Sequence, residues 1–132
     1  MEKIKKILIV EDEIAFRKVF GEEFKMREKG IKVLSADTGE MGLKIALEEH
    51  PDLIFLDVIL PIMNGIEVLK KLRIDDWGKT ATVILLTQVD DLGHVAEAVE
   101  NGVSKYFIKS DQSIPDIIDQ TSKYLADMEA GK

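Results

Sequence analysis

Short apolar runs alternate along the chain with longer segments of helical periodicity. The runs cover residues 7–10, 31–36, 53–57, 82–87 and 104–109. The first of them, "ILIV", is aliphatic without polar alternation, as is typical of strands in a parallel sheet that is covered on both faces. We therefore predict five strands, with a helix after each of them.

Helix signals stand between these runs. The expected helices cover residues 14–28, 37–49, 65–73, 91–101 and 114–128. Three of them begin at pairs that resemble a capping box, namely Asp37 with Glu40, Asn64 with Glu67, and Ser113 with Asp116. Glycines 30 and 102 and the dipeptide His50-Pro51 mark helix ends.

Strictly alternating strands and helices with short loops predict an α/β fold, in which helices cover a parallel sheet. No linker, repeat or low-complexity segment interrupts the pattern, so we expect one domain over residues 1–132. In open sheets of this kind, ligands bind beyond the carboxyl ends of the strands.

Composition narrows the class further. The chain has 132 residues, of which 45% are hydrophobic and 33% charged, and its formal net charge of −7 argues against a general nucleic-acid binder. It has no cysteine and no apolar run long enough to span a membrane. We expect a cytoplasmic protein without disulfides, thiolate metal sites or membrane attachment.

Polar residues of a consistent chemistry follow four of the five strands: Glu11 and Asp12, then Asp57, Thr87 and Lys109. Crowded carboxylates repel one another, and a hard divalent cation with oxygen ligands relieves that repulsion, so we expect Mg²⁺, with Mn²⁺ as a substitute. A carboxylate can also attack phosphorus, while a lysine and a hydroxyl neutralise the transferring group. The pattern predicts that Asp57 accepts a phosphoryl group.

Each of these residues also has an ordinary interpretation. Lys109 is alternatively a solvated lysine, Thr87 a strand-end cap, and Glu11 or Asp12 a helix cap. The four positions together, at the functional edge of this architecture, favour the site.

The motifs also match a family. "ILIVEDE", "LIFLDVILPIMNG", "ILLT" and "NGVSKYFIK" resemble, in order and spacing, the receiver domain of two-component response regulators, over essentially the whole chain. The resemblance implies a flavodoxin-like (βα)5 three-layer sandwich, with a central parallel sheet in the order 2-1-3-4-5.

The resemblance also implies roles in the site. Asp57 would accept the phosphoryl group from a phosphohistidine on a histidine kinase or histidine phosphotransfer protein. Asp12, Asp57 and the backbone carbonyl of Ile59 would ligate the metal, with Glu11 acting through water. Lys109 would contact the phosphate.

The same resemblance implies a switch. Thr87 would move to the phosphate and Tyr106 would turn inward, which repacks the face formed by the fourth helix, fifth strand and fifth helix for a downstream target or output domain. The oligomeric state stays open, between a monomer and a dimer that forms on phosphorylation.

Three positions depart from the family pattern. Ser110 follows the lysine where proline is common, so we expect a trans Lys109–Ser110 peptide. Gln88 replaces the usual small residue after the switch hydroxyl, and Ile59 adds apolar cover two residues after the acceptor. We expect Ile59 and Gln88 to control access to the phosphate and to slow its hydrolysis.

Other functions fit less well. A degenerate receiver that serves only as a docking module would not require the full set of site residues. A phosphatase of similar topology needs a general acid where Ile59 stands, so we expect no turnover of external substrates. A flavin binder would need a phosphate loop after the first strand. No output domain follows within the sequence, which fits either a stand-alone receiver or a piece of a longer regulator.

Overall fold

The computed structural model describes residues 4–88, 93–103 and 105–130. Its strands are β1 (Lys6–Val10), β2 (Lys32–Ala36), β3 (Leu53–Asp57), β4 (Val83–Thr87) and β5 (Lys105–Ile108). Its helices are α1 (Ile14–Arg27), α2 (Gly39–Glu49), α3 (Gly65–Ile74), the short 3₁₀ helix η1 (Gly78–Thr80), α4 (Gly93–Glu100) and α5 (Ile114–Ala130). The predicted alternation of strands and helices is confirmed.

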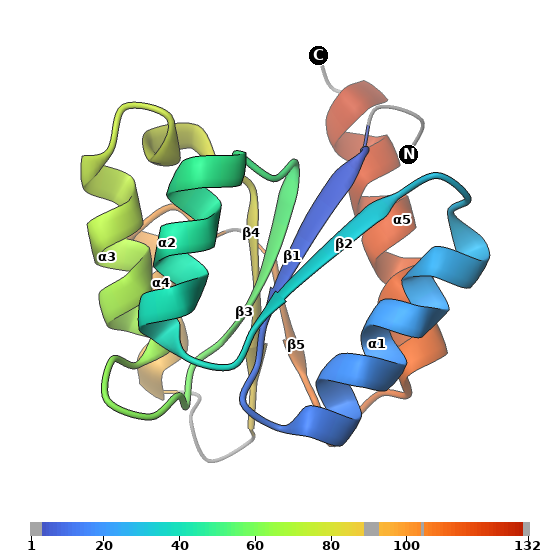
Figure 1. The fold of residues 1–132 in the computed structure, drawn as a ribbon, viewed down its shortest axis with the longest axis horizontal. Helices are drawn as coiled ribbons and strands as arrows, with labels where there is room; N and C mark the ends of the chain where they lie inside the picture. The colour runs from blue at the N-terminus through green and yellow to red at the C-terminus, as the bar shows by residue number, and fades with distance from the viewer. Residues whose placement is uncertain (1–3, 89–92, 104, 131–132) are drawn as a thin grey trace.

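All the strand pairs are parallel, and the sheet has the order β2-β1-β3-β4-β5. The flavodoxin-like order is therefore confirmed. Helices α2, α3 and α4 cover one face of the sheet and α1 and α5 cover the other, which gives three layers (Figure 1).

Alternate residues along the strands point into two separate hydrophobic cores, one on each face of the sheet. Leu8, Ile54, Leu56 and Leu85 pack under α2, α3 and α4, whereas Phe55, Ile84 and Phe107 pack under α1 and α5. All residues of β3 and β4 are buried, because helices cover both of their faces. The central strands therefore hold the residues at their carboxyl ends in fixed positions.

The helix starts follow the predicted caps in part. Asn64 and Glu67 form a full capping box on α3, and the Ser113 hydroxyl accepts from the Asp116 amide at 3.2 Å. The α2 prediction was wrong by one residue: Thr38, not Asp37, is the N-cap, and its hydroxyl accepts from the Met41 amide at 3.1 Å. The predicted start of α4 at residue 91 lies outside the described residues.

Among the described residues, no helix is long and apolar enough to cross a membrane.

Candidate functional site

The carboxyl ends of β1, β3, β4 and β5 deliver the predicted site residues to one edge of the sheet. Register places Val10 beside Leu56, Asp57 beside Leu86, and Thr87 beside Ile108. Glu11 and Lys109 directly follow their strands, and the Lys109 amide donates to the Thr87 carbonyl at 2.8 Å. These contacts bring together four residues that are far apart in the sequence: Glu11, Asp57, Thr87 and Lys109.

Lys109 lies at the centre of the site. Its ammonium is 2.7 Å from Glu11 Oε1, 3.3 Å from Asp57 Oδ2 and 3.7 Å from Glu13 Oε1. Glu11 is fully buried, Asp57 is 3% exposed, and the Lys109 side chain is 8% exposed. One buried ammonium therefore faces two buried carboxylates.

This imbalance sets the protonation of the site. Burial, together with the adjacent Asp57 carboxylate, raises the pKa of Glu11 from 4.5 to about 8, against the opposing pull of Lys109. Burial alone would lower the pKa of Lys109, but hydrogen bonding to Glu11 and the charges of Asp57 and Glu11 raise it. At neutral pH the Lys109 ammonium stays charged and Glu11 tends to hold a proton.

The acidic residues suit a divalent cation. Glu11, Asp12 and Asp57 each offer a carboxylate oxygen, and these atoms lie within 4.8 Å of one another. Glu11 Oε2 is buried and has no hydrogen-bond partner among the described residues, so it has unused capacity to accept. An all-oxygen donor set without histidine or cysteine fits Mg²⁺.

Asp57 is positioned from both sides. Its Oδ1 accepts from the Ile59 amide at 3.2 Å, while Oδ2 accepts from Lys109. A Cβ on Gly65 would lie 2.1 Å from the Asp57 carbonyl oxygen, so the loop after β3 closes directly against the acceptor. Among the described residues, no group donates a hydrogen bond to the Ile59 carbonyl, which leaves it available to a metal.

Two further residues support the site, and the sequence pattern did not single them out. The Phe16 ring faces the Lys109 ammonium, with 4.7 Å between Nζ and the ring centroid, and it packs on Phe20. Arg17 Nη1 donates to the Glu11 backbone carbonyl at 2.7 Å. Both belong to the first turn of α1.

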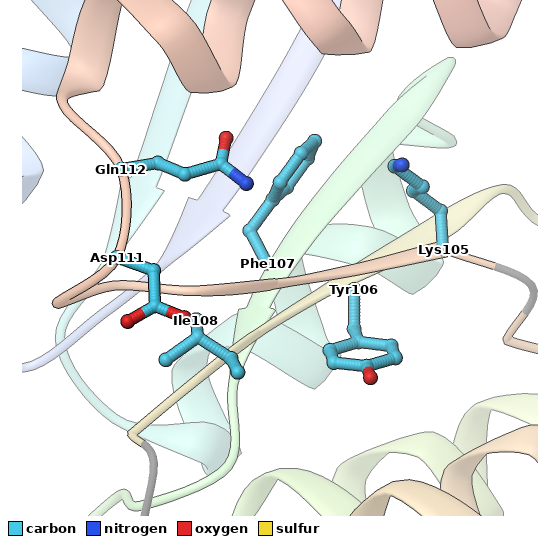
Figure 2. Close-up of a pocket in the computed structure, with 6 residues that line it drawn as sticks. All are labelled: Lys105, Tyr106, Phe107, Ile108, Asp111 and Gln112. Atoms are coloured by element: carbon cyan, nitrogen blue, oxygen red, sulfur yellow. The ribbon is translucent and has the colours of Figure 1, made fainter.

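Among the described residues, the side chains of Thr87 and Tyr106, the predicted switch residues, make no hydrogen bond to Asp57. Thr87 is fully buried, and its hydroxyl donates to the Gln88 carbonyl at 3.1 Å. Tyr106 is 41% exposed. Figure 2 shows Tyr106 and Ile108 on the opposite side of β5 from Lys105 and Phe107, beside a pocket of about 400 Å³.

The Lys109–Ser110 peptide and the side chains of Ile59 and Gln88 can be compared with the predictions from sequence. No peptide bond between described residues is cis, so Lys109–Ser110 is trans as predicted. Ile59 is 49% exposed and Gln88 is also exposed, which leaves both free to cover the site. His50 is exposed, and its ring stacks on Trp77 with 4.4 Å between the ring centroids.

Comparison with known proteins agrees with this geometry. The family model described as the response regulator receiver domain matches residues 7–119. The chain is 36% identical over 120 residues to sporulation initiation phosphotransferase F of Bacillus subtilis, covering 91% of this chain and 93% of that protein. It is 38% identical over 103 residues to the transcriptional regulatory protein AfsQ1 of Streptomyces coelicolor, covering 78% of this chain but 44% of that protein.

Solved structures show the same fold. The REC domain of AraT, a response regulator from Geobacillus stearothermophilus, superimposes with a TM-score of 0.81 at 26% identity, over 97% of this chain and 98% of that chain. A CheY-like response regulator receiver domain protein from Methanospirillum hungatei superimposes with a TM-score of 0.84 at 25% identity, over 98% of this chain and the whole of that one.

Proposed function

The chain belongs to the response regulator receiver family, whose members act in phosphorelay signalling, and we propose that Asp57 accepts a phosphoryl group from a phosphohistidine on a partner protein in a Mg²⁺-dependent reaction. One observation carries the proposal. Asp57 is a buried carboxylate within 3.3 Å of an ammonium and within 4.8 Å of two further carboxylates that suit a metal.

In the proposed reaction, a carboxylate oxygen of Asp57 forms a bond to phosphorus. The bond between phosphorus and the imidazole nitrogen breaks, and its electron pair remains on the imidazole, which takes a proton from water. The product is an aspartyl phosphate. Fixed hydrogen bonds to the Ile59 amide and Lys109 orient the Asp57 carboxylate before the donor arrives.

Asp12, Asp57 and the Ile59 carbonyl would hold the cation, with Glu11 acting through water. When bound, Mg²⁺, or Mn²⁺ in its place, neutralises negative charge on the transferring group and on the crowded carboxylates. The raised pKa of Glu11 supports this assignment, because a carboxyl that is costly to ionise alone gains from a nearby cation.

Lys109 would neutralise charge on the phosphoryl oxygens. Its ammonium already lies between Glu11 and Asp57, and its side chain is only 8% exposed, so a short displacement would bring it to the product. The Phe16 ring lies 4.7 Å from Nζ, measured to the ring centroid, and would stabilise the charge of the ammonium.

The switch follows from new hydrogen bonding. Thr87 would exchange its bond to the Gln88 carbonyl for a charge-assisted bond to the phosphate. A neutral hydrogen bond contributes about 1 kcal/mol and a charged one about 1.5–3 kcal/mol, so the exchange favours the new rotamer by roughly tenfold. The exposed Tyr106 would then turn inward and reshape the α4-β5-α5 face.

We propose Ile59 and Gln88 as the residues that set the lifetime of the aspartyl phosphate. Both side chains are exposed; Ile59 stands two residues after Asp57, and Gln88 directly follows Thr87. An apolar group and a long amide there would exclude the hydrolytic water or hold it out of line. Slow hydrolysis follows from this arrangement.

We further propose that residues 1–132 form a single receiver domain that acts in the cytoplasm. Its donor is a histidine kinase or histidine phosphotransfer protein, and its reader is a downstream protein or output domain. One relative is named a phosphotransferase and another a transcriptional regulatory protein. These names support both kinds of reader, a downstream protein and an output domain. The chain promotes its own phosphorylation and dephosphorylation without turnover of external substrates, and without binding nucleic acid or membrane itself.

The proposal is tested with acetyl phosphate and with beryllofluoride, each with and without Mg²⁺. We expect acetyl phosphate to phosphorylate the wild type, and beryllofluoride to raise its melting temperature, only when Mg²⁺ is present. Asp57→Asn should abolish both responses. Asp76→Asn, which alters a fully exposed aspartate, is the matched control and should keep them. A wild-type chain that responds to neither reagent would contradict the proposal.

A further inference from the structure

Strand β2 lies at one edge of the sheet, and β1 is its one neighbouring strand among the described residues (Figure 1). The Lys32 amide points toward β1, where it donates to the Lys5 carbonyl at 2.7 Å. Because backbone direction alternates along a strand, the amides and carbonyls of Val33 and Ser35 point away from β1. This outer edge of β2 is therefore available to another strand.

A groove of about 320 Å³ borders this edge, between α1 and β2. Val33 and Ser35 line it from the strand, and Gly21 lines it from the helix. A Cβ on Gly21 would lie 3.3 Å from Val33 Cγ1, so the helix comes close to the strand at this glycine. The groove is thus a built feature of the packing of α1 on β2.

The groove carries a net positive charge. Arg17, Lys18 and Lys25 line it, together with one acidic residue, Glu22, although the chain as a whole has a formal net charge of −7. The Arg17 guanidinium already donates to the Glu11 backbone carbonyl. Lys18 and Lys25 are exposed, and neither forms an ion pair with another described residue. These two lysines are therefore available to a negatively charged partner.

We propose that the groove between α1 and β2 is a docking surface for an acidic, extended segment of a partner protein, which adds to the sheet as a further strand beside β2. The backbone of the segment would pair with the free amides and carbonyls of Val33 and Ser35, the usual mode of strand addition. Successive side chains of a strand point to opposite faces of the sheet. Every second residue of the segment would therefore face α1, where aspartate or glutamate would meet Lys18 and Lys25.

Charge argues against a second copy of this chain as the occupant. Pairing of two β2 edges would bring together two sets of exposed lysines, Lys18, Lys25 and Lys32, and like charges repel. Lysine on an edge strand also disfavours pairing with an uncharged apolar strand. An acidic strand gains from the same lysines.

A nucleic acid fits the surface less well than a polypeptide. Its phosphate oxygens can accept from the amides of Val33 and Ser35, but they cannot donate to the carbonyls beside them. The net charge of −7 would also repel it. A polypeptide strand offers donors and acceptors in the alternation that the β2 edge requires.

The test measures the binding of synthetic peptides to the whole, unphosphorylated chain. The first probe is a fluorescein-labelled peptide in which glutamate and valine alternate. A second peptide has lysine in place of glutamate. A third has proline in place of valine, which keeps the charge but favours the polyproline II conformation over a strand. Fluorescence anisotropy gives the dissociation constant, and NMR of the isotope-labelled protein locates the contact.

Two variants separate the contributions of charge and backbone. Lys18→Gln with Lys25→Gln removes the available cations, and Ser35→Pro removes an outward amide from the edge. The matched control, Lys71→Gln with Lys123→Gln, makes the same change of net charge at exposed positions on α3 and α5. Binding is measured without a phosphodonor, so its outcome is independent of the proposed phosphoryl transfer.

We expect the glutamate–valine peptide to bind the wild type and to shift the NMR signals of the Val33 and Ser35 amides. The variant of Lys18 and Lys25 should raise the dissociation constant about fivefold, because two exposed ion pairs are lost. Ser35→Pro should weaken binding at least as much, through loss of a backbone hydrogen bond. The control variant should bind as the wild type does, and the lysine and proline peptides should bind neither.

Absence of binding by the glutamate–valine peptide at millimolar concentration would overturn the inference. So would equal binding of the proline peptide, or an unchanged dissociation constant in the variant of Lys18 and Lys25. Self-association of the wild type that Ser35→Pro abolishes, or tighter binding of single-stranded oligothymidylate than of the peptide, would assign the surface to another occupant. If Ser35→Pro does not fold, the lysine variant and the NMR shifts still decide.

Discussion

Replacing Glu11 by glutamine should make the metal-free protein more stable at neutral pH. Glu11 is fully buried beside Asp57, and its pKa in the folded protein is about 8, against 4.5 for the free side chain. The folded state therefore binds a proton at Glu11 that the unfolded state has released. A group with a raised pKa stabilises the fold fully below pH 4.5, and this stabilisation is lost as the pH rises toward 8.

The size of this stability difference follows from how the free energy of unfolding depends on pH. One extra proton bound by the folded state lowers the free energy of unfolding by about 1.4 kcal/mol per pH unit. From pH 5 to pH 7 the wild type should lose about 2–3 kcal/mol relative to Glu11→Gln, in which the amide cannot ionise. The two proteins should be close in stability near pH 5.

Urea denaturation in EDTA at pH 5, 6 and 7, followed by circular dichroism, measures this difference. Glu48→Gln, on the exposed surface of α2, is the matched control, and its free energy of unfolding should change with pH as that of the wild type does. Added Mg²⁺ should stabilise the wild type more as the pH rises, because binding must displace the Glu11 proton. If the free energy of unfolding of the wild type and of Glu11→Gln changes equally with pH, the pKa of Glu11 is not raised in the folded protein.

Three further predictions concern phosphate lifetime, lysine positioning and switching. The double variant Ile59→Asn with Gln88→Ala should shorten the half-life of the aspartyl phosphate, measured by loss of radiolabel; an unchanged half-life would exclude control by these residues. Phe16→Leu should slow phosphorylation by acetyl phosphate about threefold through loss of the ring beside Lys109, whereas Phe16→Tyr should retain the wild-type rate. Thr87→Ala should still be phosphorylated, but NMR should show Tyr106 unmoved by beryllofluoride, and an inward movement of Tyr106 would contradict its coupling to Thr87.

Much of the fold could be predicted from sequence because the signals are local. The aliphatic runs of β1, β3 and β4 are buried on both faces of the sheet. They therefore contain consecutive apolar residues, a pattern typical of the central strands of a parallel sheet. The α2 start was missed by one residue because Asp37 and Thr38 are both good caps, and only the backbone path decides between them.

The site could be predicted as a set of residues but not as a geometry. The positions of Glu11, Asp57 and Lys109 at the ends of predicted strands identified them as site residues. The sequence does not reveal that the Lys109 ammonium lies closer to Glu11 than to Asp57. The contact between the Phe16 ring and the Lys109 ammonium joins residues from opposite ends of the chain, and no local pattern predicts it. Such features arise from tertiary packing, which local patterns do not encode.

The proposed function requires that Asp57 becomes an aspartyl phosphate. After incubation with acetyl phosphate and Mg²⁺, borohydride reduces an acyl phosphate to the alcohol, and peptide mass spectrometry then locates the reduced residue. We expect homoserine at position 57, and its loss when EDTA replaces Mg²⁺. Reduction at Asp12 or another carboxylate, or no reduced residue at all, would contradict it.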